Sequence, residues 1–69
     1  MTATARQNMI MQTFATMDKP LNRREVLMYT NYRPCLILDA LRSLVDDGQL
    51  VCCHPELPVD HYDQEYRRP

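Results

Sequence analysis

The sequence has no tryptophan, a single glycine and no long apolar run. A membrane-spanning helix needs about 20 consecutive apolar residues, so we expect no membrane partner. Residues 1–5 also lack the positive charge and the apolar stretch of a secretory signal peptide. The first expectation is therefore a cytoplasmic protein.

Cysteine is present only three times, and an odd number does not make a disulfide framework. Cys52, Cys53 and His54 are consecutive, and with His61 they suggest a metal site. Adjacent cysteines of a strand point to opposite faces and rarely bind one ion, and no C-x-x-C motif supports them. We therefore predict no metal and no cofactor.

Catalytic motifs are also missing from the chain. It contains no Gly-rich phosphate loop, no nucleophile elbow and no HExxH sequence. A chain of 69 residues forms one small core, which leaves no room for a deep substrate cleft. These absences predict a protein that is not an enzyme and has no small-molecule substrate.

The chain has no excess of positive charge. Eight Lys and Arg residues oppose nine Asp and Glu residues, for a net charge of −1. Nucleic-acid binders usually have a basic excess or at least one basic face. Here Arg23, Arg24 and Arg33 lie mid-chain, while acidic residues gather in the last third, so the charge balance does not decide the class of partner.

Local signals predict three helices, over about 5–17, 22–29 and 34–47. Ile10, Phe14 and Met17 recur at helical spacing in the first. Asn22 followed by Glu25 resembles a capping box that opens the second. These two helices are separated by a break at residues 18–20, which end in a proline.

The third helix has the strongest pattern. Pro34 suits its first position and Gly48 suits the residue that ends it. The apolar stripe predicted to face the core consists of Ile37, Ala40, Leu41 and Leu44.

After Gly48 the pattern changes to that of a short strand, residues 50–53. Two prolines then interrupt regular pairing. A return strand within about 59–68 is predicted, with Tyr62 and Tyr66 as apolar anchors on one face. The region 49–67 would form a β-hairpin.

Three helices followed by a hairpin, with the pattern L-x-x-L-x-x-x-G-x-L-V from Leu41 to Val51, resemble the winged helix-turn-helix superfamily. The resemblance covers about residues 8–66. It implies a mainly α fold with a small β-hairpin, in the order α-α-α-β-β, and a single winged-helix domain over 1–69.

The same resemblance implies a small DNA-binding transcriptional regulator, as a homodimer, that reads duplex DNA with its third helix. Arg33 and Arg42 would contact the groove. Backbone phosphates and peripheral sites would be contacted by the remaining arginines, namely Arg23, Arg24, Arg67 and Arg68.

The alternative is a protein-interaction module on the same fold. The predicted outward face of the third helix carries Leu36 and Asp39, which suit a protein contact better than a DNA contact, and the predicted wing has no Lys or Arg between residues 53 and 64. In this interpretation the partner contacts Tyr32, Leu36, Asp39 and Leu57.

Overall fold

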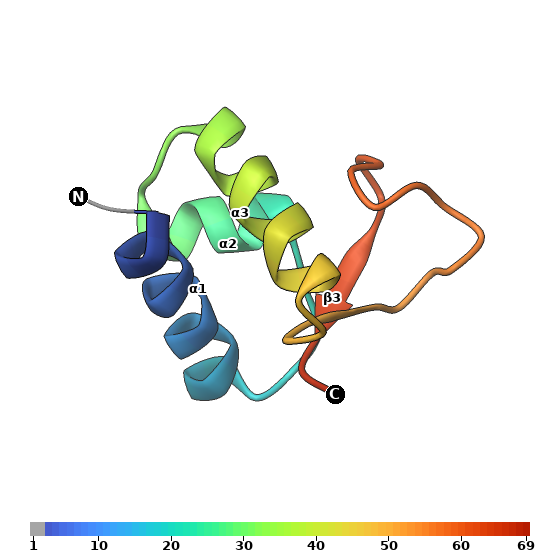
Figure 1. Cartoon of the computed structure of the whole chain (residues 1–69), viewed down its shortest axis with the longest axis horizontal. Coiled ribbons are helices and arrows are strands. Elements are labelled where there is room, and N and C mark those ends of the chain that lie inside the picture. Colours follow the sequence, from blue (N-terminus) through green and yellow to red (C-terminus); the bar gives the residue numbers. More distant parts are fainter. Residues whose placement is uncertain (1–2) are drawn as a thin grey trace.

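Three helices and three short strands make up the part of the chain that the structure describes, in an arrangement that is mainly helical with a small antiparallel sheet (Figure 1). The computed structural model describes residues 3–69, with side chains from residue 5 onward. In chain order the elements are α1 (Ala3–Met17), β1 (Leu21–Asn22), α2 (Arg23–Thr30), α3 (Pro34–Asp46), β2 (Val51–Cys52) and β3 (Glu65–Arg67).

The three predicted helices are present, and each begins or ends within a few residues of its predicted bounds. The capping box of α2 is complete, because Asn22 Oδ1 accepts from the Glu25 N–H at 2.9 Å and Glu25 Oε1 accepts from the Asn22 N–H at 3.2 Å. Gly48 follows α3 with a φ of 77°, in the left-handed region that glycine adopts without strain.

The core lies where the three helices and the sheet meet. Ile37, Ala40, Leu41 and Leu44 of α3 are all buried, as the apolar stripe predicts. Residues of α1, β1, α2, β3 and the segment before β2 complete the core, namely Ile10, Phe14, Leu21, Val26, Leu50 and Tyr66.

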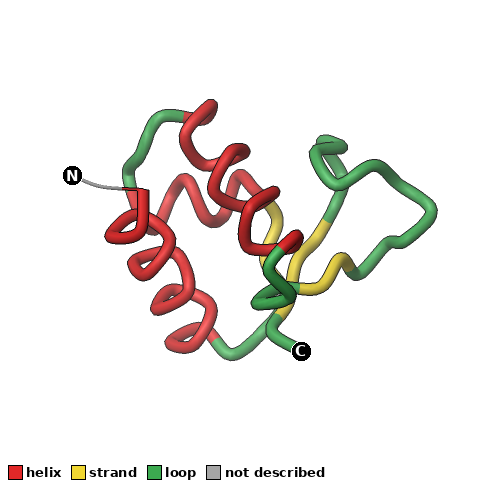
Figure 2. The backbone as a smooth tube through the Cα atoms, in the orientation of Figure 1, coloured by secondary structure: helices red, strands yellow, loops and turns green. Residues whose placement is uncertain are grey.

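The sheet contains one more strand than the sequence predicts. β3 lies in the centre and pairs antiparallel with β1 and β2 (Figure 2). Leu21 of β1 lies opposite Tyr66, and Cys52 of β2 lies opposite the same residue. Because β1 has only two residues, it carries no alternating pattern of its own, and its pairing with β3 defines it.

The predicted return strand over 59–68 is much shorter in the structure. Only Glu65–Arg67 form a strand, and the residues between β2 and β3 form a long loop of turns, part of which projects beyond the helices (Figure 1). The prediction that Tyr62 and Tyr66 share a strand face is wrong. Tyr66 is fully buried, while Tyr62 lies in the loop and is 50% exposed.

Gln64 gives this loop its shape. Its side chain is fully buried, and its amide nitrogen donates to the carbonyls of His54, Leu57 and Pro58 at 2.8, 3.1 and 3.2 Å. Its amide oxygen accepts from the His54 N–H at 2.9 Å. One side chain therefore forms the hydrogen bonds with backbone groups that strand pairing would otherwise provide.

Within residues 3–69, none of the helices has both the length and the apolar character that a membrane span requires.

Candidate functional site

A groove of about 300 Å³ opens between α2, α3 and the loop that precedes β3. Its walls come from three segments that are far apart in the sequence. Most of the lining is apolar, and the residues are Arg23, Arg24, Leu27, Pro34, Ile37, Leu38 and Tyr62.

Tyr62 holds two arginines at the edge of this groove. The guanidinium carbons of Arg23 and Arg24 lie 4.8 and 4.2 Å from the centroid of its ring. This is the range of cation–π attraction, in which the electron-rich face of the ring attracts a cation. Arg23 also donates to the carbonyl of Asp60 at 3.4 Å, which links α2 to the loop a second time.

Local structure fixes each part of this arrangement. The capping box makes Arg23 and Arg24 the first two residues of α2. Gln64 holds the loop that carries Tyr62, and Pro34 begins α3 beside the groove. The capping box therefore positions the two arginines, and the hydrogen bonds of Gln64 position the loop that carries the tyrosine.

The charge on the two arginines is not neutralised by a close carboxylate. Neither residue takes part in the four ion pairs formed among the described residues. A side-chain hydrogen bond with Tyr62 raises the pKa of Arg24 above its ordinary value, and the more distant carboxylates of Asp63 and Glu25 act in the same direction.

The structure distributes the other predicted DNA contacts over separate places. Arg33 is exposed and precedes the first residue of α3. Arg42 shares a hollow with Asp46, Val59 and Asp60, so two acidic residues line the same hollow.

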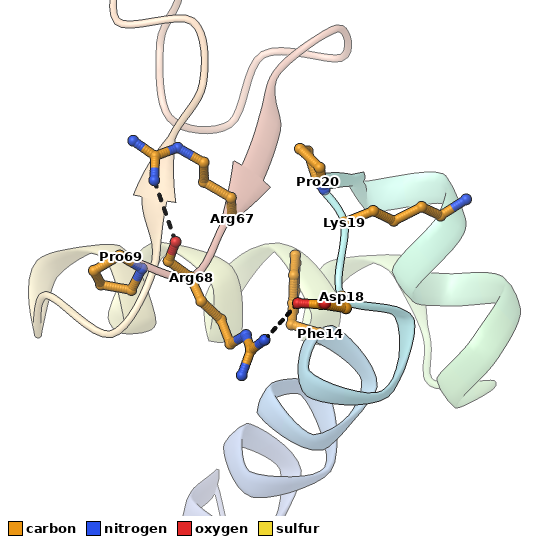
Figure 3. Close-up of a pocket in the computed structure, with 7 residues that line it drawn as sticks. All are labelled: Phe14, Asp18, Lys19, Pro20, Arg67, Arg68 and Pro69. Carbon is orange, nitrogen blue, oxygen red and sulfur yellow. Dashed lines mark hydrogen bonds and ion pairs between the residues drawn. The ribbon is translucent and has the colours of Figure 1, made fainter.

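Arg67 and Arg68 lie beside the C-terminal end of α1, in a hollow with Phe14 and Asp18 (Figure 3). Arg68 forms an ion pair with Asp18 at 2.8 Å. Arg67 turns its guanidinium to the carbonyl of Arg68 at 3.3 Å. The six arginines predicted to bind DNA therefore do not form one surface: Arg23 and Arg24 line one hollow, Arg67 and Arg68 another, and Arg33 and Arg42 lie apart from both.

The surface around α3 is more acidic than basic. After its first residue, α3 exposes Cys35, Asp39, Arg42 and Asp46. The loop beside it exposes Glu56, Asp60 and Asp63.

The residues of the alternative interface also lie in separate places. Tyr32 and Leu36 are half-buried, and Tyr32 has the guanidinium carbon of Arg6 at 6.0 Å from its ring centroid. Asp39 lines a small hollow with Arg6 of α1. Leu57 belongs to the distant loop, where its carbonyl is bound by Gln64.

Sequence reasoning did not identify Leu27, Leu38 or Tyr62 as site residues. Leu38 could have been identified from the sequence, because it lies beside the core stripe of α3 and makes the apolar face of the helix wider than the core requires. Tyr62 could not have been identified in this way, since its position depends on the fold of the loop.

The cysteines and histidines form no cluster of metal ligands. Cys52 and Cys53 are half-buried, and burial raises the pKa of both thiols. His54 instead contacts the carboxylates of Glu65 and Glu56, at 3.0 and 3.6 Å. Among residues 3–69 there is no group of three or more His, Cys, Asp and Glu side chains suited to a metal ion.

Comparison of the chain with protein-family models, with curated proteins and with solved structures gives no match.

Proposed function

We propose that this chain is a winged-helix domain that works as a non-enzymatic protein-interaction module, and that the groove receives a segment of its partner. The order of three helices, with two strands after α3 that pair antiparallel, supports the winged-helix part of the proposal.

The observation that carries the functional part is the composition of the groove. Its floor is formed by aliphatic side chains, and its edge by two arginines and a tyrosine. Tyr and Arg are the residue types enriched at the energetic centres of protein interfaces, where they surround or fill apolar pockets. A groove of about 300 Å³ is at the small end of the range for ligand pockets, roughly 300–1,000 Å³. Its size suits one or two side chains of a protein partner.

Duplex DNA is the second candidate ligand, and a specific observation favours it. Arg23 and Arg24 begin α2, and Arg33 directly precedes α3. The N-terminal residues of a recognition helix are those that reach base edges in helix-turn-helix proteins. The carboxylates exposed along α3 and the loop argue against DNA binding, because the negatively charged phosphates of DNA would repel them.

The experiment that tests the proposal selects ligands without bias. The full chain is immobilised and screened against a displayed library of random peptides, and selected peptides are synthesised with a fluorescent label. Each peptide and a mixed-sequence duplex DNA are then titrated by anisotropy at about 50 and 200 mM salt. The variant Leu38→Asp changes the groove floor. Leu36→Asp is the comparison variant, because Leu36 is also half-buried on α3 and does not line the groove. Leu36 belongs to the interface predicted from the sequence, so loss of binding in this variant would favour that interface over the groove.

The proposal predicts peptides whose binding is lost in Leu38→Asp and kept in Leu36→Asp. It also predicts weak binding of DNA. Steeply salt-dependent DNA binding that survives Leu38→Asp, together with no selected peptide, would overturn the protein-interaction proposal in favour of the second candidate.

A further inference from the structure

Assuming the proposed function, we infer that the groove binds a peptide segment in which one bulky apolar side chain lies next to carboxylates. The apolar side chain would occupy the floor formed by Leu27, Ile37 and Leu38. The carboxylates would pair with Arg23 and Arg24.

The charge at the edge of the groove selects for an acidic segment. Tyr62 covers a face of each guanidinium group, and an arginine stacked in this way still has N–H donors in the guanidinium plane. Such donors match the two oxygens of a carboxylate and form hydrogen bonds about twice as strong as neutral ones.

The chain's own acidic groups leave these donors available. Glu25 is engaged by the backbone N–H of Asn22 and by Lys19, whose ammonium lies 3.8 Å from its other oxygen. Asp63 acts on Arg24 but is exposed and forms none of the ion pairs among the described residues. A carboxylate of the partner therefore competes with the carbonyl of Asp60 at Arg23, with Tyr62 and Asp63 at Arg24, and with water at both.

The floor selects for an apolar side chain. Pro34, Ile37 and Leu38 come from one side of the groove, and Leu27 comes from the other. Burying apolar surface against them is worth about 25 cal/mol per Å² removed from water. A nucleic-acid backbone would pair with the arginines but leave this floor in contact with water, so the two halves of the groove together favour a peptide.

The test uses three labelled synthetic peptides of one length with a Gly/Ser framework. The first contains Phe next to two Glu residues, the second replaces both Glu by Lys, and the third keeps both Glu but replaces Phe by Ala. Titration of the full chain should give the tightest binding for the first. Each replacement should weaken it by about tenfold or more, which corresponds to about 1.4 kcal/mol.

The charge-reversal pair Arg23→Glu, Arg24→Glu should lose the Phe/Glu peptide and reverse the preference between the Glu and Lys peptides. The control is Arg67→Glu, Arg68→Glu, which has the same net charge but changes the hollow beside α1. It should keep the wild-type preference. Circular dichroism of both variants verifies that they fold.

Failure of this inference differs from failure of the proposed function. If the unbiased selection gives peptides that require Leu38 but have no acidic residues, the groove binds proteins and the acidic preference is wrong. If the Phe/Glu peptide binds equally to both charge-reversed variants, its carboxylates do not contact Arg23 and Arg24. If only duplex DNA binds, both statements are wrong.

Discussion

Gln64 is the residue on which the loop between β2 and β3 depends most. Its polar side chain is fully buried, and its amide nitrogen donates hydrogen bonds to the carbonyls of three other residues. The variant Gln64→Leu keeps a similar volume but leaves these carbonyls without their donor. We expect the free energy of unfolding to fall by about 2–3 kcal/mol, because buried polar groups without partners are costly.

Urea denaturation measures this difference, with Gln49→Leu as the control. Gln49 is exposed, so its replacement should change the free energy of unfolding little. Equal stabilities of the two variants would show that the loop holds its shape without Gln64.

Because the hydroxyl of Tyr66 is buried, we expect the free energy of unfolding to fall at alkaline pH. Its hydroxyl donates to the carbonyl of Val59, and burial raises the pKa of Tyr66 to about 12. An unfolded tyrosine titrates near pH 10, so the folded state holds this proton more tightly than the unfolded state. The contribution of Tyr66 is therefore fully present below about pH 10 and is lost as the pH rises towards 12.

The variant Tyr66→Phe tests this pH dependence. At neutral pH it should be less stable by about 1 kcal/mol, the net value of one hydrogen bond. Denaturant unfolding at a series of pH values should then show a smaller alkaline loss for the variant than for the natural chain. Parallel curves would mean that Tyr66 titrates normally.

Among the elements, α2 is short and depends on its cap. The chain enters it through a reciprocal pair of hydrogen bonds between Asn22 and Glu25. Asn22→Ala should lower the free energy of unfolding by about 1 kcal/mol. Thermal and urea unfolding check this value beside Asn8→Ala, which replaces an exposed residue inside α1 and should cause no loss. If both variants were equally stable, the cap would contribute nothing.

The end of α3 is formed by the left-handed conformation of Gly48 and by backbone hydrogen bonds from Asp47, Gly48 and Gln49 to the last turn. A Cβ atom added at Gly48 would meet nothing within 4 Å, so the cost of a substitution there is the cost of its positive φ. Gly48→Val should destabilise the protein by about 1–2 kcal/mol, and Gly48→Asn by less, because asparagine visits this region more readily. The same unfolding measurements rank the two variants, and the reverse order would contradict the explanation.

The helices could be predicted because their signals are local. Asn22, Pro34 and Gly48 mark helix ends within one turn of the positions they affect. The sheet was harder, because β1 exists only through Leu21 and its distant partner Tyr66. The return strand was predicted too long for the same reason, since Gln64 replaces strand pairing by contacts that no periodicity reveals.

The candidate site shows the same division. The sequence alone indicates Arg23 and Arg24 as candidate site residues, because positive charge at the start of a helix is unfavourable next to the helix dipole. Their stacking on Tyr62, and the floor that Leu38 contributes, require the folded loop and the packing of α2 on α3.

The homodimer stays a prediction. Met9 and Tyr29 are 46% and 44% exposed and line a hollow between α1 and α2 that has no Lys, Arg, Asp or Glu. If the chain dimerises, this neutral surface can meet its own copy without repulsion between like charges. Sedimentation of the natural chain and of Met9→Lys over a range of concentrations should show a dimer weakened by the added lysine. A natural chain that remains monomeric at every concentration would contradict the homodimer.

An NMR titration of the ¹⁵N-labelled chain with the Phe/Glu peptide and, separately, with duplex DNA tests directly whether the groove binds a peptide. We expect the peptide to shift the amide signals of residues that line the groove, namely Arg23, Arg24, Leu27, Leu38 and Tyr62. We expect only small changes with DNA. Large shifts with DNA at Arg33, Cys35 and Arg42, and none with the peptide, would contradict the protein-interaction proposal.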